Sequence, residues 1–162
     1  MNTNQQIIEE FYAAFASSEP ETIASCYHPE AVFHDPVFGK LEGADITDMW
    51  RMLLDRAKGR LGITFSDIAA DAVSGKAQWN VQYEFGPSNR LIVNTVSSRF
   101  RFRDGLIVEH NDEFDFYRWN RQAFGLKGWL LGNTSYMQNK VREQAVSALR
   151  KWQSAKSTST TP

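Results

Sequence analysis

Two stretches decide the fold of this chain: residues 27–36, which read YHPEAVFHDP, and residues 104–112, which read DGLIVEHND. In the first, the run from Glu30 to Asp35 predicts a short strand, which Pro36 ends because proline cannot donate to a strand ladder. In the second, Asp104-Gly105 between two β-rich runs is the strongest turn pattern in the chain. We therefore expect one strand that ends at Asp35 and another that carries Asp112.

Helical periodicity surrounds the first stretch. Thr3 and Gln6 fit a capping box, and a helix is expected from there to about Ser17. Its apolar stripe is Ile7, Ile8, Phe11, Tyr12 and Phe15. A short helix follows Pro20 and stops at His28-Pro29. Asp45 is expected to cap a third helix, whose stripe is Ile46, Met49, Trp50, Leu53 and Leu54.

From about Ile63 to Tyr117 the pattern changes to short β-rich runs separated by turn residues, which predicts a four-stranded antiparallel meander. Helical periodicity returns over 118–124 and again over about 134–153. We therefore expect an α+β fold, a cone-shaped barrel of curved sheet wrapped around the N-terminal helices. The expected division is a domain over 1–117, a helical extension over 118–153 and a disordered tail over 154–162.

Composition describes one ordinary domain and excludes several classes of protein. The chain has 162 residues, 18 Lys and Arg and 19 Asp and Glu, so it offers no broad positive field and we expect no nucleic-acid partner. Its single cysteine, Cys26, excludes an internal disulfide and a multi-thiolate zinc site, and fits a reducing compartment.

Targeting patterns are missing from the sequence as given. No apolar run approaches the roughly 18 residues of a membrane helix, and the first residues lack the pattern of a signal peptide. We therefore expect a cytoplasmic location and no membrane partner. The aromatic content, 13%, could line a hollow interior or simply fill a core.

The element order, the YHPEAVFHDP stretch, Gly43 before the third helix and the DGLIVEHND stretch together resemble the nuclear transport factor 2-like superfamily. More narrowly, they resemble its polyketide-cyclase-like branch, which also holds ketosteroid isomerases and limonene epoxide hydrolases. The resemblance covers roughly residues 3–117. It implies the fold better than the function, because this fold hosts isomerases, cyclases, hydrolases and proteins without chemistry. It also implies a homodimer that pairs on an apolar outer face of the sheet.

The resemblance implies a catalytic role for Asp35, because an Asp at the matching Asp-Pro position is the proton-shuttling base of ketosteroid isomerases. From the residues alone, Asp35 could equally accept backbone N–H bonds in the turn at Pro36. The superfamily's first-helix tyrosine falls on Phe11, next to Tyr12, and its protonated acid falls near Ser97. The chain is therefore not expected to be a ketosteroid isomerase proper.

Strand periodicity places His110, Asp112 and Phe114 on one face, because successive side chains of a strand alternate. The opposite face is nearly all acidic, so the first is expected to point inward. The resemblance puts Asp112 where epoxide hydrolases and polyketide cyclases keep a catalytic acid, and His110 is either its proton-transfer partner or a packing residue. The strand from about Lys76 to Phe85 lacks the Arg and Asp two residues apart that an epoxide hydrolase needs, which disfavours hydrolysis by that triad.

Residues 97–103, SSRFRFR, support two registers. Alternation by hydrophobicity buries Phe100 and Phe102, whereas the register counted from the Asp104-Gly105 turn points Ser97 and Arg99 into the pocket. A β-bulge would reconcile the two. An inward Arg99 would bind an anionic group or an enolate, whereas outward arginines form a solvated or dimer-facing stripe.

Candidates for the apolar wall of a pocket, with ordinary core packing as the alternative, are Phe33, Trp50, Trp79 and Tyr83. The three histidines show no paired ligand spacing, so we expect no metal, and no cofactor.

Three functions remain open. The first is a cofactor-free acid/base enzyme of isomerase, cyclase or hydrolase type, acting on an apolar carbonyl-bearing or polycyclic small molecule. In it Asp112 and Asp35 are acid and base, and His110 and Tyr12 position them. The second is a module that binds such a ligand without turnover. The third is a protein-interaction domain whose pocket is filled by side chains.

Overall fold

Six strands form one curved sheet in the order β2-β1-β6-β5-β4-β3. The computed structural model describes residues 3–159. The strands are β1 (Tyr27–Asp35), β2 (Gly39–Glu42), β3 (Gly62–Ala70), β4 (Ser74–Phe85), β5 (Arg90–Arg103) and β6 (Leu106–Glu113). The expected antiparallel meander is β3 to β6, and β1 joins it by pairing parallel with β6 and antiparallel with β2. The sheet stays open, since β2 and β3 are both edge strands.

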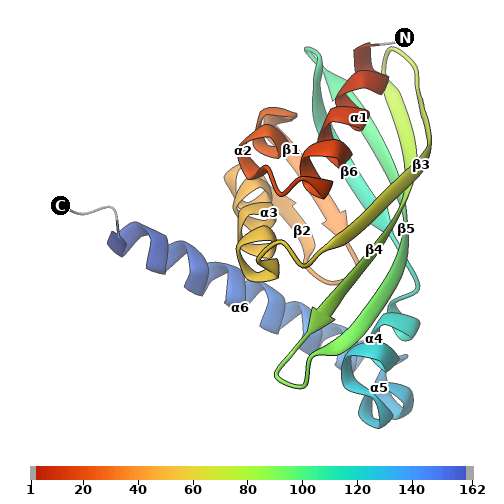
Figure 1. Ribbon diagram of the computed structural model, residues 1–162, viewed down its shortest axis with the longest axis vertical. Helices are drawn as coiled ribbons and strands as arrows, with labels where there is room; N and C mark the ends of the chain where they lie inside the picture. Colours follow the sequence, from red (N-terminus) through yellow and green to blue (C-terminus); the bar gives the residue numbers. More distant parts are fainter. Residues whose placement is uncertain (1–2, 160–162) are drawn as a thin grey trace.

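Helices α1 (Thr3–Ala16), α2 (Pro20–Ser25) and α3 (Ala44–Ala57) lie against one face of this sheet (Figure 1). The stripe of α1 that the spacing predicts is its buried face, which includes Ile8, Phe11, Tyr12 and Phe15. The rings of Phe11 meet those of Tyr12, Tyr27, Trp50 and His110 edge to face. The expected α+β cone, a curved sheet around N-terminal helices, is therefore confirmed.

The third helix begins two residues earlier than predicted, at Ala44. Gly43, with a φ of +54°, precedes Ala44 and makes no side-chain cap bond. The prediction that Asp45 caps this helix is wrong, because Asp45 lies inside the first turn and its carboxylate binds the C-terminal helix instead.

The C-terminal region holds three helices: α4 (Phe116–Phe124), α5 (Leu126–Leu131) and α6 (Ser135–Ser159). The sequence predicts the first and the last, and α5 is new. Helix α6 continues through residues 154–159, where a disordered tail is expected, and residues 160–162 lie outside the described part. Because Leu149 of α6 is buried in the main core and Trp119 of α4 packs on β5 through Ile92, these helices belong to the body of the domain.

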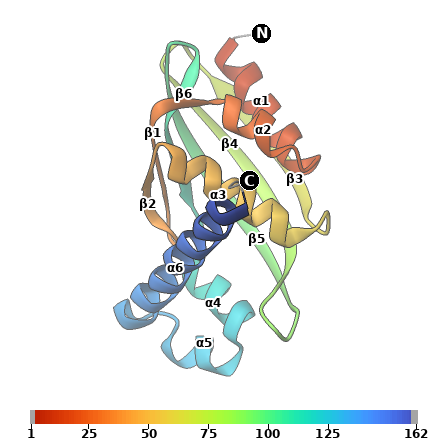
Figure 2. The same ribbon diagram turned by 90° about the vertical axis from the view of Figure 1, so that its left-hand side faces the viewer.

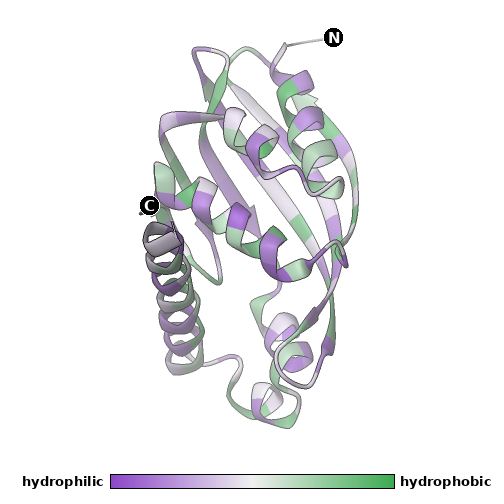
Figure 3. Cartoon of the chain, turned by 60° about the vertical axis from the view of Figure 1, so that its left-hand side comes forward, coloured by the Kyte–Doolittle hydropathy of each residue, from purple (hydrophilic) through white to green (hydrophobic). Residues whose placement is uncertain are grey.

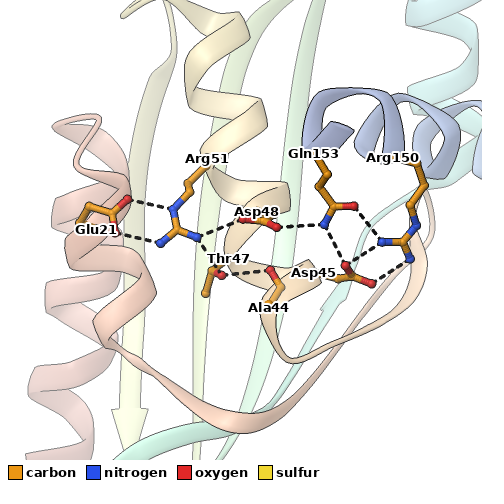
Figure 4. A network of polar contacts seen from close by, with 8 residues as sticks. All are labelled: Glu21, Ala44, Asp45, Thr47, Asp48, Arg51, Arg150 and Gln153. Atoms are coloured by element: carbon orange, nitrogen blue, oxygen red, sulfur yellow. Dashed lines mark hydrogen bonds and ion pairs between the residues drawn. The ribbon is translucent and has the colours of Figure 1, made fainter. Parts of the chain in front are cut away.

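Helix α6 crosses in front of α3 (Figure 2) and is tied to it by polar contacts (Figure 4). Arg150 donates to both oxygens of Asp45 at 2.7 and 2.8 Å. Gln153 donates to Asp45 and to Asp48, both at 2.9 Å. Arg51 links Asp48 to α2 by donating twice to Glu21. One continuous network therefore joins α2, α3 and α6.

The register of β5 and β6 decides which side chains face inward. On β5 every second residue from Ile92 to Phe102 is buried without interruption. The irregularity lies on β6, where Arg101 pairs with Glu109 and Phe102 with Ile107, so Val108 is an extra residue. This bulge lets both Ile107 and His110 face inward.

The inward placement of Ser97 and Arg99 is therefore wrong. Both are exposed, while Ser98 and Phe100 point inward. Arg99 lies 3.4 Å from Glu113 and Arg101 lies 4.0 Å from Glu109, across the outer face of the sheet. The outward arginine stripe is the register that the structure adopts.

The outer face of the sheet is mainly polar, contrary to the apolar face that the homodimer expectation assumes. Outward positions of β4 include Gln78, Asn80, Gln82 and Glu84, and those of β6 are Glu109, Asn111 and Glu113. The outward apolar residues of β5, Leu91 and Val93, lie at the start of that strand, before the outward polar run from Thr95 to Arg103. The homodimer stays a prediction. Within residues 3–159, no helix is long and apolar enough to cross a membrane.

Candidate functional site

A cavity of about 600 Å³ opens between the inner face of the sheet and helices α3, α4 and α6. Its walls are mainly apolar and aromatic, and include Trp50, Trp79, Tyr83, Phe114 and Trp119. Two carboxylates that are not exposed reach it, Asp35 from the end of β1 and Asp112 from the middle of β6, and the exposed Glu84 lies at its edge. An apolar cavity with a few convergent polar groups is the usual form of a small-molecule site.

Asp35 combines a turn role with a place in the cavity wall. Its Oδ1 accepts the backbone N–H of Val37 at 3.0 Å and that of Phe38 at 2.6 Å. Its Oδ2 accepts no hydrogen bond from the described residues. The sequence leaves open whether Asp35 stabilises the turn at Pro36 or serves the site, and its position allows both. One carboxyl oxygen fixes the side chain in the turn, and the other is left to the cavity.

The pKa of Asp35 is raised to about 7. Burial is the largest cause, since the low-dielectric wall disfavours the charged form, and the negative charge of Asp112 adds to it. The two backbone N–H bonds and the charge of Arg142 act in the opposite direction. A carboxyl with this pKa changes protonation near neutral pH, which general acid/base catalysis requires.

Asp112 is held on one side by a buried relay. It is only 3% exposed, and its Oδ1 lies 2.8 Å from His110 Nε2. His110 Nδ1 lies 2.6 Å from the Tyr27 hydroxyl, which accepts the indole N–H of Trp50 at 3.0 Å. One proton assignment satisfies every member: Tyr27 donates to Nδ1, and the Nε2–H of His110 donates to Asp112.

Ser98 holds the same oxygen of Asp112 from the other side. Its hydroxyl donates to Oδ1 of Asp112 in a short hydrogen bond. The Ser98 oxygen in turn accepts the hydroxyl of Tyr12 at 2.7 Å and the indole N–H of Trp79 at 2.9 Å. Asp112 Oδ1 thus accepts two hydrogen bonds, while Oδ2 has no hydrogen-bond partner among the described residues.

None of the ion pairs in residues 3–159 joins Asp112 to a Lys or Arg. Burying a carboxylate without a cation is costly unless hydrogen bonds compensate, and such sites concentrate at functional positions. Because of this cost, we infer that the hydrogen bonds around Asp112 serve a functional site as well as the packing of the core.

Tyr83 supplies a hydroxyl to the cavity. Its oxygen accepts the indole N–H of Trp119 at 2.9 Å. Burial is the main cause that raises the pKa of Tyr83 to about 12, and the charge of Asp35 contributes. The phenol therefore stays protonated at neutral pH, and its proton is free to meet a ligand, since the described residues offer it no hydrogen-bond acceptor.

The structure brings some predicted residues to the cavity and leaves others behind its wall. Asp35, Trp50, Trp79, Tyr83, Asp112 and Phe114 line it. Three lie one layer deeper: His110 in the relay, Tyr12 behind Ser98, and Phe33 against the rings of Trp50 and His110. Ser97 and Arg99 face away.

Sequence reasoning misses Ser98, Tyr27 and Asn94. Ser98 is next to the residue that turn counting selects, and the unbroken alternation with Phe100 and Phe102 is the pattern that could have found it. Asn94, buried on the same strand, follows the same alternation and lines the cavity. Within residues 3–159, no group of three or more His, Cys, Asp or Glu is placed to hold a metal ion.

Residues 8–110 match the family model of the SnoaL-like domain. The chain belongs to the SnoaL-like domain family. This confirms the polyketide-cyclase-like branch of the nuclear transport factor 2-like superfamily that the sequence resembles. A search of the curated proteins finds no match.

Several solved structures share the SnoaL-like fold. A limonene-epoxide-hydrolase-like (LEH-like) epoxide hydrolase of M. tuberculosis is 24% identical with a TM-score of 0.57, over 80% of this chain and 91% of that one. TsrD from Streptomyces laurentii is 25% identical with a TM-score of 0.61, over 76% and 96%. A putative SnoaL-like polyketide cyclase from a Jannaschia species is 12% identical with a TM-score of 0.63, over 76% and 92%. At such identities these likenesses establish the fold and leave the chemistry to the site.

Proposed function

We propose that this SnoaL-like domain is a cofactor-free acid/base enzyme acting on an apolar, carbonyl-bearing or polycyclic small molecule. One observation carries the proposal: Asp35 and Asp112 line the same apolar cavity, and the pKa of Asp35 is raised to about 7. Pairs of carboxyls whose environments differ are the usual basis for dividing acid and base roles.

The chemistry follows from three of the polar groups at the cavity wall. Asp35, when ionised, removes a proton from the carbon next to a carbonyl, and the electron pair moves onto the carbonyl oxygen. The Tyr83 hydroxyl is placed to donate a hydrogen bond to that oxygen as charge develops. The proton on Asp35 then reaches its new position on the substrate, either directly or by way of the ionised Asp112, which takes it from Asp35 and passes it on, and the electron pair returns from the oxygen. His110 and Ser98 position Asp112, and Tyr12 acts through Ser98 as a positioning residue.

The solved structures that share the fold include an epoxide hydrolase and a putative polyketide cyclase, and both names are consistent with a small-molecule substrate. Hydrolysis by an Arg and Asp pair on β4 is not part of the proposal. The outward residues of that strand include Gln78, Asn80 and Gln82, and its inward residues Trp79, Val81 and Tyr83 supply neither group.

The first experiment identifies a ligand. The protein purified from its native host is examined by native mass spectrometry and, after denaturing extraction, for a small molecule that co-purifies. An apolar carbonyl compound or a polycyclic one supports the proposal and supplies a compound for turnover assays. Repeated absence, with no thermal shift across a panel of hydrophobic ligands, contradicts it and favours an interaction domain.

The second experiment separates catalysis from binding. Asp112→Asn is expected to abolish turnover of the identified compound while it keeps the fold, and Ser97→Ala on the outer face is the matched control. Binding without turnover is the second candidate function, favoured by one observation: the Tyr12 hydroxyl donates to Ser98 and does not line the cavity. If the wild type binds the compound and never converts it, the binding module is correct.

A further inference from the structure

Exposed apolar side chains gather at one end of the molecule. Nine large hydrophobic side chains are exposed within residues 3–159, and five of them fall in residues 126–136. We call these five the α5 patch: Leu126, Trp129, Leu130, Leu131 and Tyr136. Leu126 is 73% exposed and Leu130 is 62% exposed. Helix α5 forms the end of the molecule opposite the N-terminus (Figure 1), and hydrophobic positions follow its ribbon in Figure 3.

The chain around the α5 patch is rich in cations. Residues 116–142 include five cations and no acidic residue, and four of the five, Arg118, Arg121, Lys127 and Lys140, are exposed, whereas the Nε of Arg142 is buried. The rest of the chain keeps 13 of the 18 Lys and Arg against all 19 Asp and Glu, a net charge of −6. The overall charge of −1 therefore hides a positive end on an otherwise acidic protein. Arg90 adds a further cation there, since it donates to the Gln122 carbonyl at 2.6 Å.

The backbone under the patch is fixed by specific contacts. The space at Gly128 admits no side chain, because a Cβ would lie 2.0 Å from the Asn120 carbonyl oxygen. The Tyr117 hydroxyl donates to the Trp129 carbonyl at 2.9 Å, and the Asn120 side-chain amide donates to the Gly132 carbonyl at 3.2 Å. Helix α5 is thus held against α4 by its backbone, which leaves its leucines and tryptophan to the outside.

We propose that the α5 patch docks on the surface of an anionic lipid bilayer. Leucine and tryptophan side chains enter the boundary between head groups and acyl chains, and cations around them meet anionic head groups. A second copy of the chain fits less well, because two-fold pairing through this end would bring eight exposed like charges together with no acid of residues 116–142 to offset them. A phosphate backbone would be met by the cations alone and leaves the exposed leucines without a role.

The docked end adjoins the cavity. Trp119 and Phe124 of α4 and Val141 of α6 line it. An apolar ligand dissolved in the bilayer would therefore reach the cavity from the docked side, and this clause alone rests on the proposed function. The sequence analysis expects no membrane partner, because the chain shows neither a spanning run nor a signal peptide, and the proposed surface contact departs from that expectation.

The experiment is co-sedimentation of the full chain with vesicles of phosphatidylcholine alone, or of phosphatidylcholine with about 30% phosphatidylserine. The wild type is expected to bind the anionic vesicles and to be released by salt. The variants Leu126→Ser/Leu130→Ser and Lys127→Glu are each expected to weaken binding about tenfold. Val73→Ser and Lys76→Glu, at exposed positions on the opposite end of the sheet, are matched controls expected to bind as the wild type does.

Trp129 gives a second readout, because it is 57% exposed whereas Trp50, Trp79 and Trp119 are buried and Trp152 is half-buried, with its indole N–H donated to Asp55. Its emission is expected to shift to shorter wavelength on anionic vesicles, and Trp129→Phe removes most of that shift. No sedimentation with anionic vesicles at low salt overturns the proposal, as does equal binding by the patch variants and the controls. Self-association of the wild type without vesicles, abolished in Leu126→Ser/Leu130→Ser, also overturns it and assigns the patch to a second copy.

Discussion

Asp35 shows how a single residue can serve the fold and the site together. Its Oδ1 closes the turn after β1 through Val37 and Phe38, which fixes the carboxyl against the cavity. Burial then raises its pKa to about 7, so the folded state binds the proton more tightly than the unfolded chain, whose Asp has a pKa near 3.9. The residue is therefore a destabilising charge above neutral pH, as many functional groups are.

The upward shift of the Asp35 pKa gives the first prediction. Between about pH 4 and 7, the folded state keeps the Asp35 proton that the unfolded chain has lost, so this group lowers the free energy of unfolding as pH rises, by up to about 1.4 kcal/mol per pH unit. Asp35→Asn keeps the Oδ1 acceptor and removes that slope. It is expected to be more stable than the wild type at pH 8, measured by urea unfolding at several pH values. If the free energy of unfolding changes with pH in the same way in both proteins, Asp35 is not the source of the pH dependence.

Ser98 carries the second prediction. Ser98→Ala leaves the buried Tyr12 hydroxyl and Trp79 indole N–H without their acceptor and takes a donor from Asp112. The expected loss is about 1–3 kcal/mol per orphaned group. Ser97→Ala, one residue away on the outer face, is expected to change stability by less than about 0.5 kcal/mol. Denaturant unfolding of both variants also tests the register of β5, in which Ser98 points inward and Ser97 outward. Equal losses of stability in the two variants would contradict that register.

At this scale the sequence predicts the site in part. The inward face of His110, Asp112 and Phe114 follows from alternation alone and is what the structure shows. Counting from the Asp104-Gly105 turn predicts that Ser97, and not Ser98, faces the pocket, because the count takes no account of the extra residue on β6. A bulge depends on how two strands pair, which the pattern within one strand does not record.

Among the elements, α6 most alters the picture expected from the sequence. Its length is predicted from its apolar spacing, but its contacts are not. Asp45 and Asp48, which look like an N-terminal cap and a solvated charge, bind Arg150 and Gln153 from 105 to 108 residues away in the chain (Figure 4). Helix α5 is missed because its three flanking and internal glycines read as loop, whereas Gly128 serves a close helix–helix contact.

The third prediction tests whether α6 belongs to the core. Leu149 is fully buried, so Leu149→Ala is expected to lower the free energy of unfolding by about 2–5 kcal/mol in one cooperative transition. Arg150→Ala removes the half-exposed ion pair with Asp45 and is expected to cost about 0.2–1 kcal/mol. Thermal unfolding followed by calorimetry distinguishes them. A separate low-temperature transition in Leu149→Ala would mean that α6 folds apart from the sheet.

The whole molecule joins two features that no single element displays. One is the cavity, whose walls come from the open sheet and from helices that precede and follow the meander in the chain. Its volume depends on how these elements pack, which the sequence pattern does not determine. The other is the charge polarity, which the net charge conceals. Sequence patterns predict the α+β cone because strand and helix periods are local, while the space they enclose is not.

The oligomeric state is the fourth prediction. The superfamily resemblance implies a homodimer, while the mainly polar outer sheet face offers it only a small apolar surface at Leu91 and Val93. If the dimer forms by cross-sheet charges such as Arg99 and Glu113, sedimentation equilibrium is expected to show an association that weakens as salt rises. A monomer at every salt concentration would contradict the expectation.

Asp35 and Asp112 line one apolar cavity, and the charge of Asp112 contributes to the raised pKa of Asp35. Carbon-13 NMR titration of the aspartate carboxyls in the wild type and in Asp112→Asn tests this coupling without knowledge of the substrate. We expect one carboxyl with a pKa of about 7, identified by its loss in Asp35→Asn, and a lower pKa for that carboxyl in Asp112→Asn. If every aspartate instead titrates near its ordinary value, or if the Asp35 pKa is unchanged in Asp112→Asn, the carboxyl pair proposed as acid and base is wrong.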